Sequence, residues 1–91
     1  MVEVRGNDIY RAGVKIGWLN QNRLYDRTGK ELGYFTSDAV YDVKGERLAR
    51  IEGDYVYAGG KRIELEQVIH GIAAIGLSDA ARVAVSTFLG V

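Results

Sequence analysis

The chain contains no cysteine and no proline. A fold without cysteine has neither disulfides nor thiolate metal ligands, which is typical of a reducing compartment, so we expect a cytoplasmic protein. Proline removes a backbone N–H and interrupts strand pairing. Its absence permits backbone pairing along nearly the whole chain.

Net charge is also lacking, because twelve Lys and Arg residues balance twelve Asp and Glu residues. Such a chain has no overall field to attract nucleic acid or anionic membranes, so we expect no nucleic-acid partner. The start of the chain, residues 1–5, lacks the basic and apolar segments of a signal peptide. With 91 residues, 47% of them hydrophobic, the sequence predicts a single domain over residues 1–91.

Four tandem copies of a unit of about sixteen residues occupy residues 8–66. Each copy has an apolar residue, a tyrosine, a short polar turn that ends in glycine, and a further apolar residue three positions later. The tyrosines are Tyr10, Tyr25, Tyr41 and Tyr57, and the glycines are Gly13, Gly29, Gly45 and Gly60. A pattern of this kind indicates an internal repeat of one small supersecondary unit.

The turns identify that unit as a β-hairpin. Asp26 and Asp42 follow the tyrosine, where an Asp side chain can bind the backbone amide two residues on. Gly29 and Gly45 then accept the positive φ that closes a type I turn with a bulge. We therefore interpret both aspartates as turn residues and not as catalytic groups.

Apolar side chains alternate along the strand after each turn, so that Ile16 and Trp18 are expected on one face. A two-stranded hairpin cannot bury such a face alone, so the four copies must share a core. Gly17, Gly33 and Ala49 are small at one repeat position, as expected where strands crowd near an axis. The sequence therefore predicts a mainly β fold, a pseudo-fourfold ring of hairpins that forms a shallow, closed or nearly closed barrel.

The tail, residues 67–91, is apolar and predicted to be helical. Residues 68–75 are expected to form one short segment, and Ser78 to cap a second helix. So apolar a tail has three possible places: inside the barrel, against other copies in a homo-oligomer, or in a membrane. Asp79 and Arg82 interrupt the apolar stretch, so membrane crossing is the least favoured.

At its repeated motif, clearest over residues 24–32, the chain resembles the four-fold β-flower domain. The resemblance covers residues 8 to about 66 and implies a small shallow barrel of radiating hairpins, with no settled activity. Such domains are more distantly similar to the Tubby C-terminal-like and scramblase-related barrels. In those lipid-related barrels a helix occupies the centre, which would suit the tail of this chain.

Aromatic residues are the candidate ligand-binding group. A fourfold arrangement would place the tyrosines at equivalent positions, where they could line a shallow pocket for an apolar or chain-like ligand or, as we favour, pack hairpin against hairpin. Trp18 and Tyr34 share a second column, which Arg50 and Leu65 break, and this asymmetry could mark a binding face. The candidate set is Tyr10, Tyr25, Tyr41, Tyr57, Trp18 and Tyr34.

No motif for an enzyme, a metal or another cofactor stands out. The single histidine, His70, has apolar neighbours and no cysteine to assist it, which favours a packing role. We expect a non-enzymatic interaction or ligand-binding module that self-associates through residues 67–91. The alternative is a peripheral lipid-binding or membrane-associated barrel.

Overall fold

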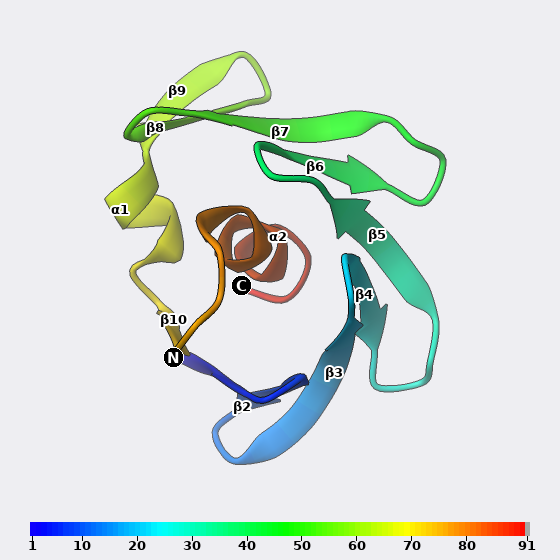
Figure 1. The fold of residues 1–91 in the computed structure, drawn as a ribbon. Coiled ribbons are helices and arrows are strands. Elements are labelled where there is room, and N and C mark those ends of the chain that lie inside the picture. Colours follow the sequence, from blue (N-terminus) through cyan, green and yellow to red (C-terminus); the bar gives the residue numbers. More distant parts are fainter. Residues whose placement is uncertain (91) are drawn as a thin grey trace.

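The computed structural model describes residues 1–90, and Val91, the end of the predicted tail, lies outside them. Ten strands form one sheet in the order β10-β1-β2-β3-β4-β5-β6-β7-β8-β9. Figure 1 shows this sheet curling around a central helix, with four hairpins pointing outward. The elements are β1 Val2–Arg5, β2 Asp8–Arg11, β3 Val14–Asn20, β4 Arg23–Asp26, β5 Glu31–Phe35, β6 Ala39–Asp42, β7 Arg47–Glu52, β8 Tyr55–Ala58, β9 Lys61–Glu64, α1 Leu65–Ile69, β10 Ile72–Ala74 and α2 Asp79–Leu89.

The four predicted hairpins are confirmed as β2–β3, β4–β5, β6–β7 and β8–β9, and each of the first three also pairs with the next along the chain. The same backbone hydrogen bond closes the open end of all four. In order, the amides of Leu19, Phe35, Ile51 and Leu65 donate to the carbonyls of Asn7, Asn22, Asp38 and Asp54, at 2.7, 3.0, 2.7 and 2.8 Å. This repetition shows that the copies are structurally equivalent and not merely similar in sequence.

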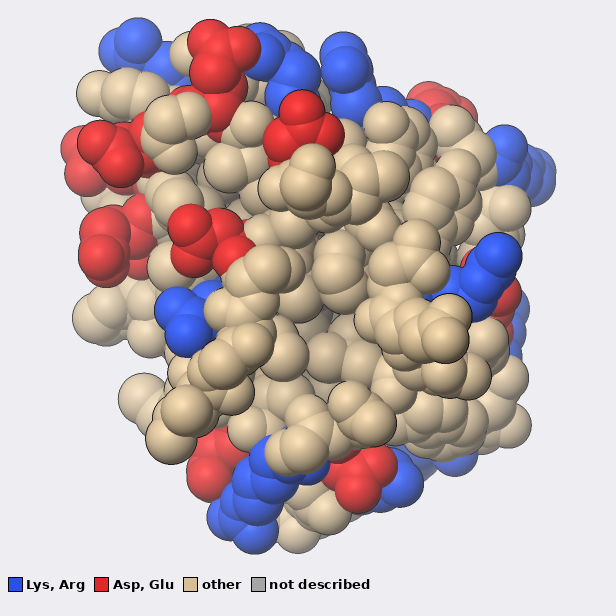
Figure 2. All heavy atoms as spheres, viewed as in Figure 1, with Lys and Arg blue, Asp and Glu red and all other residues tan. Residues whose placement is uncertain are grey.

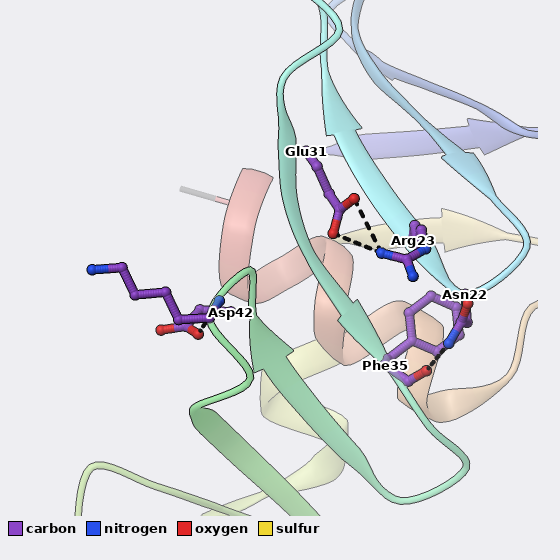
Figure 3. A network of polar contacts seen from close by, with 6 residues as sticks. Asn22, Arg23, Glu31, Phe35 and Asp42 are labelled. Atoms are coloured by element: carbon purple, nitrogen blue, oxygen red, sulfur yellow. Dashed lines mark hydrogen bonds and ion pairs between the residues drawn. The ribbon is translucent and has the colours of Figure 1, made fainter.

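The aspartate turns are as predicted. The Oδ1 atom of Asp26 accepts the backbone N–H groups of Thr28 and Lys30 at 2.8 and 3.1 Å. Asp42 does the same in the third hairpin, at the turn seen on the left of Figure 3. Gly29 and Gly45 have φ values of 91° and 85°, which residues with a Cβ rarely adopt. These turns are fixed by local chemistry.

Polar contacts also brace the second hairpin (Figure 3). Arg23 Nη1 lies 3.1 and 3.0 Å from the two carboxylate oxygens of Glu31, and Asn22 Nδ2 donates to the Phe35 carbonyl at 3.2 Å. The Thr28 hydroxyl, together with the backbone amides of Lys30 and Thr28 and the Lys30 charge, lowers the pKa of the Asp26 carboxyl below its usual value. The ion pair between Arg23 and Glu31 is largely exposed, so we expect it to contribute little to the stability of the fold.

One face assignment was wrong: Ile16 and Trp18 do not share a strand face. A bulge lies between the two halves of the first hairpin, since Gly17 pairs with Ile9 while Lys15 pairs with Tyr10, and Ile16 has no partner between them. Ile16 packs against the core. Gly17, directly after it, and Leu19 are buried and also face inward. The extra residue shifts the alternation, so Trp18 lies on the outer face.

The core lies between the sheet and α2. The residue before each tyrosine points inward, and these four residues, Ile9, Leu24, Val40 and Val56, are at most 2% exposed. From α2 they meet Val83 and Val85, which are fully buried. The Ser78 hydroxyl accepts the Ala81 amide at 3.1 Å and caps the helix, as predicted. The second half of the tail thus occupies the interior of the sheet.

The first half of the tail differs from the prediction, because residues 72–74 form a strand and not part of a helix. This strand, β10, pairs in parallel with β1. The sequence analysis predicted neither strand. Val2 and Val4 of β1 are buried. The short helix α1 lies between β9 and β10, so the sheet is not closed. Among residues 1–90, no helix has both the length and the apolar composition needed to span a bilayer.

Candidate functional site

The repeated aromatic residues lie on the outer face of the sheet, one set at each junction between neighbouring hairpins. The rings of Trp18 and Tyr25 stack with centroids 5.6 Å apart, and those of Tyr34 and Tyr41 stack at 5.1 Å. At the third junction the Arg50 guanidinium takes the place of the first ring, 4.5 Å from the Tyr57 centroid. The four repeat tyrosines therefore occupy equivalent places but are not brought together in one pocket.

Tyr10, the first repeat tyrosine, follows the same rule. Its ring lies 5.1 Å from the guanidinium of Arg5 on β1. The extra strand thus supplies a packing partner where no preceding hairpin exists.

On the inner face, the first two hairpins fit closely against the end of α2. A Cβ on Gly33 would lie 2.4 Å from Cζ of Phe88, and one on Gly17 would lie 3.0 Å from a methyl of Leu89. Arg11 donates a hydrogen bond to the Leu89 carbonyl, a favourable contact at the negative end of a helix. The large residues at the end of α2 therefore fill the space that the glycines leave.

A cavity of about 490 Å³ remains on the other side of α2, between the helix and the fourth hairpin. We call it the hairpin-four pocket. Its walls come from β7, β8, β9, α1, the segment that joins α1 to β10, the start of β10, and the second half of α2. It is lined by Ala49, Val56, Ala58, Ile63, Gln67, Val68, His70, Gly71, Ile72, Val83, Ser86, Thr87 and Gly90.

A second hollow, of about 680 Å³, opens near the start of α2 and is strongly acidic. Asp54, Glu64, Glu66 and Asp79 line it together with Arg82. Figure 2 shows acidic side chains gathered on the side where α1 and β8 lie, while uncharged atoms cover the centre of this face. Within the described part of the chain, no three His, Cys, Asp or Glu side chains are placed to hold a metal ion.

Four equivalent hairpins around a central helix, each with a tyrosine before its turn and an apolar residue three positions after the turn glycine, are now established. The model of the family described as "4-fold beta flower protein" matches residues 8–67, about two thirds of the chain. The chain belongs to this family. No match was found among the curated proteins or among the solved structures. The similarity of this β-flower to Tubby and scramblase-related barrels stays a prediction.

The pocket residues of the β-flower were largely missed by sequence reasoning, which had selected aromatic residues. Three signals were nevertheless present. Ala49 replaces the glycine of the earlier copies, the fourth turn is one residue shorter than the second and third, and Ser86 and Thr87 are small polar residues in the second half of α2. Ser86 and Thr87 leave room beside the fourth hairpin, and Ala49 and the shorter turn change the spacing of its strands relative to the second and third hairpins.

Proposed function

We propose that this β-flower is a non-enzymatic module that binds a neutral, apolar, chain-like ligand in the hairpin-four pocket. The observation that carries the proposal is the cavity itself, whose volume of about 490 Å³ lies within the range typical of small-molecule sites. Strands and two helices form most of its walls, so the pocket exists before a ligand arrives. A preformed site avoids the entropy cost of ordering on binding.

The lining explains why the ligand should be apolar and uncharged. Val56, Ile63, Val68 and Ile72 supply hydrocarbon walls, and the side chains of Gln67, Ser86 and Thr87 carry neutral hydrogen-bonding groups. No Asp, Glu, Lys or Arg is among the lining residues that the structure describes. An aliphatic alcohol or a similar chain would bury its tail and direct a hydroxyl toward a side-chain partner.

Several features support a binding role over a catalytic one. His70 is the single imidazole of the chain and is exposed. The Thr87 hydroxyl donates to the Val83 carbonyl at 2.7 Å, so its proton is already engaged within the helix. A nucleophile activated by an oriented base needs a partner within hydrogen-bond reach, and the contacts described around Ser86 and Thr87 supply none.

The test is a fluorescence titration with N-phenylnaphthylamine, a neutral apolar probe, followed by displacement with octanol. We expect saturable binding to the unmodified chain. Ser86→Phe would place a phenyl ring in the pocket and weaken probe binding about tenfold or more, a change of about 1.4 kcal/mol. The matched control is Ser37→Phe in the exposed β5–β6 loop, which should bind as the parent does.

Two results would overturn the proposal: no saturable binding to the unmodified chain, or equal binding by Ser86→Phe while its circular dichroism stays unchanged.

Self-association through residues 67–91, a cytoplasmic location and membrane association remain separate predictions. Five residues of α2 are buried against the sheet, which leaves them unavailable to another copy: Ala80, Ala81, Val83, Ala84 and Val85. Ile75, in contrast, is 100% exposed and could contact a partner. Light scattering at increasing concentration tests the oligomer, and co-sedimentation with liposomes tests the membrane alternative.

A further inference from the structure

The first two junctions between neighbouring hairpins have the same close contact, and the third junction differs from them. At the first junction a Cβ on Gly17 would lie 2.3 Å from the Tyr25 carbonyl oxygen, and at the second a Cβ on Gly33 would lie 2.3 Å from that of Tyr41. Such an approach is open to glycine alone. Close strand contact at these junctions therefore requires that Gly17 and Gly33 have no side chain.

At the third junction Ala49 occupies the glycine position. The pairing of β7 with β8 ends at Arg50↔Tyr57. Gly17↔Asp26 and Gly33↔Asp42 extend the pairing of the first two junctions by one further residue. We attribute this difference to the methyl group of Ala49, because a side chain at this position keeps the strands from approaching as closely. The sheet consequently opens one residue earlier here.

The first two junctions also have an aromatic ring over the neighbouring turn. A Trp18 ring carbon lies 3.7 Å, and the Tyr34 hydroxyl 3.4 Å, from the positions that a Cβ would take on Gly29 and Gly45. The third junction has Arg50 in place of a ring, and its turn is one residue shorter. A hollow of about 360 Å³ results, and its lining includes Arg47, Arg50, Tyr57, Gly59, Gly60 and Lys61.

The charge in this hollow is of one sign. Arg47, Arg50 and Lys61 line it, and its described lining residues include no carboxylate. Arg50 forms an ion pair with Glu52, but Arg47 and Lys61 are absent from the ion pairs found among the described residues. The protein as a whole has no net charge, but this hollow holds three positively charged side chains and only one of them is paired with a carboxylate. The hollow is therefore locally positive.

We propose that this hollow binds a phosphate-bearing anion. Two guanidinium groups offer paired N–H donors that match phosphate oxygens, and Lys61 adds a third positive charge. Glycines at the turn keep one wall free of side chains, so a tetrahedral anion can approach the backbone. The hollow shares Ala49 and Ala58 with the hairpin-four pocket, but Arg47, Arg50 and Lys61 line this hollow alone. The proposal therefore does not depend on the function proposed for the pocket.

A titration of the full chain with inorganic phosphate at low ionic strength tests the proposal, followed through the amide NMR signals of residues 59–61. We expect saturable shifts there, with sodium chloride of equal ionic strength giving none that saturate. The double variant Arg47→Gln/Lys61→Gln should bind about tenfold more weakly or worse, since two charge-assisted contacts are lost. The matched control Arg27→Gln, at the exposed tip of the second hairpin, should bind as the parent does.

Two further titrations identify the source of the phosphate: glycerol phosphate for a soluble phosphomonoester, and phosphatidylcholine vesicles with and without phosphatidic acid for a headgroup. Saturable shifts at residues 59–61 in any of the phosphate arms support the site and name its ligand class. The proposal fails if phosphate in every arm gives no saturable shift. It also fails if Arg27→Gln weakens binding as much as the double variant, which would mean diffuse surface attraction.

Discussion

The first two hairpins and the fourth hairpin follow the same sequence pattern, but the first two pack closely against α2 whereas the fourth is lined by hollows. On the first side, glycine at the inner position lets the strands and the end of α2 approach closely, so that Phe88 contacts Gly33 directly. On the fourth side, the inner position before the junction carries Ala49, and two hollows meet at this residue. The methyl group of Ala49 thus distinguishes this side from the closely packed one, because the short turn of the fourth hairpin is shared by the first.

The largest expected effect breaks the close side. Gly33→Ala places a Cβ 2.3 Å from the Tyr41 carbonyl oxygen and 2.4 Å from the Phe88 ring, so either the strands or α2 must move. We expect a loss of about 3 kcal/mol in the free energy of unfolding, at the upper end for overpacking. Urea denaturation measures it. Gly71→Ala is the control, since a Cβ there meets nothing within 4 Å, and should change stability by less than about 0.5 kcal/mol.

A smaller effect sharpens the comparison from the open side. Ala49→Gly restores the residue of the other junctions, so β7 and β8 should pair one residue further and the phosphate hollow should narrow. We expect a stability loss of about 1 kcal/mol or less, from backbone entropy and a lost buried methyl group, and weaker phosphate binding. The phosphate titration and urea denaturation of the same variant measure both. Unchanged affinity would show that Ala49 does not open the site.

The smallest expected effect concerns the turns. The hydrogen bonds to Asp26 lower its pKa in the folded state, so their stabilisation is present above the unfolded pKa and is lost as pH falls through the lower folded value. Asp26→Asn should therefore lose less stability than the parent between about pH 7 and about pH 3, as measured by thermal unfolding. The fourth hairpin has Ala58 at this position and contributes no such dependence. An identical acid response in parent and variant would contradict this assignment.

Local chemistry was predictable from the sequence, whereas contacts between distant segments were not. The Asp26 turn and the Ser78 cap depend on residues within a few positions of each other, so their patterns were sufficient. The bulge at Ile16 and the strand β10 depend on partners elsewhere: β10 exists because β1, some seventy residues away, offers an edge. The apolar composition of residues 72–74 fits a buried strand as well as a helix, and only the partner decides.

The candidate site shows the same division. The break in the aromatic column at Arg50 was visible in the sequence and does mark the unusual junction. Its meaning required the structure, because the short pairing beside Ala49 and the position of α2 arise from packing. The aromatic residues were identified correctly as a repeated set, but they lie on the outer face and hold neighbouring hairpins together.

The decisive measurement is an amide chemical-shift map of the whole chain, titrated first with inorganic phosphate and then with octanol. If binding sites arise where the fourfold pattern is broken, phosphate should shift residues 47–50 and 57–61, and octanol should shift β8, β9, the α1–β10 connection and the end of α2. Equal shifts at Tyr10, Tyr25, Tyr41 and Tyr57 would contradict this, because they would place ligands on the regular column instead.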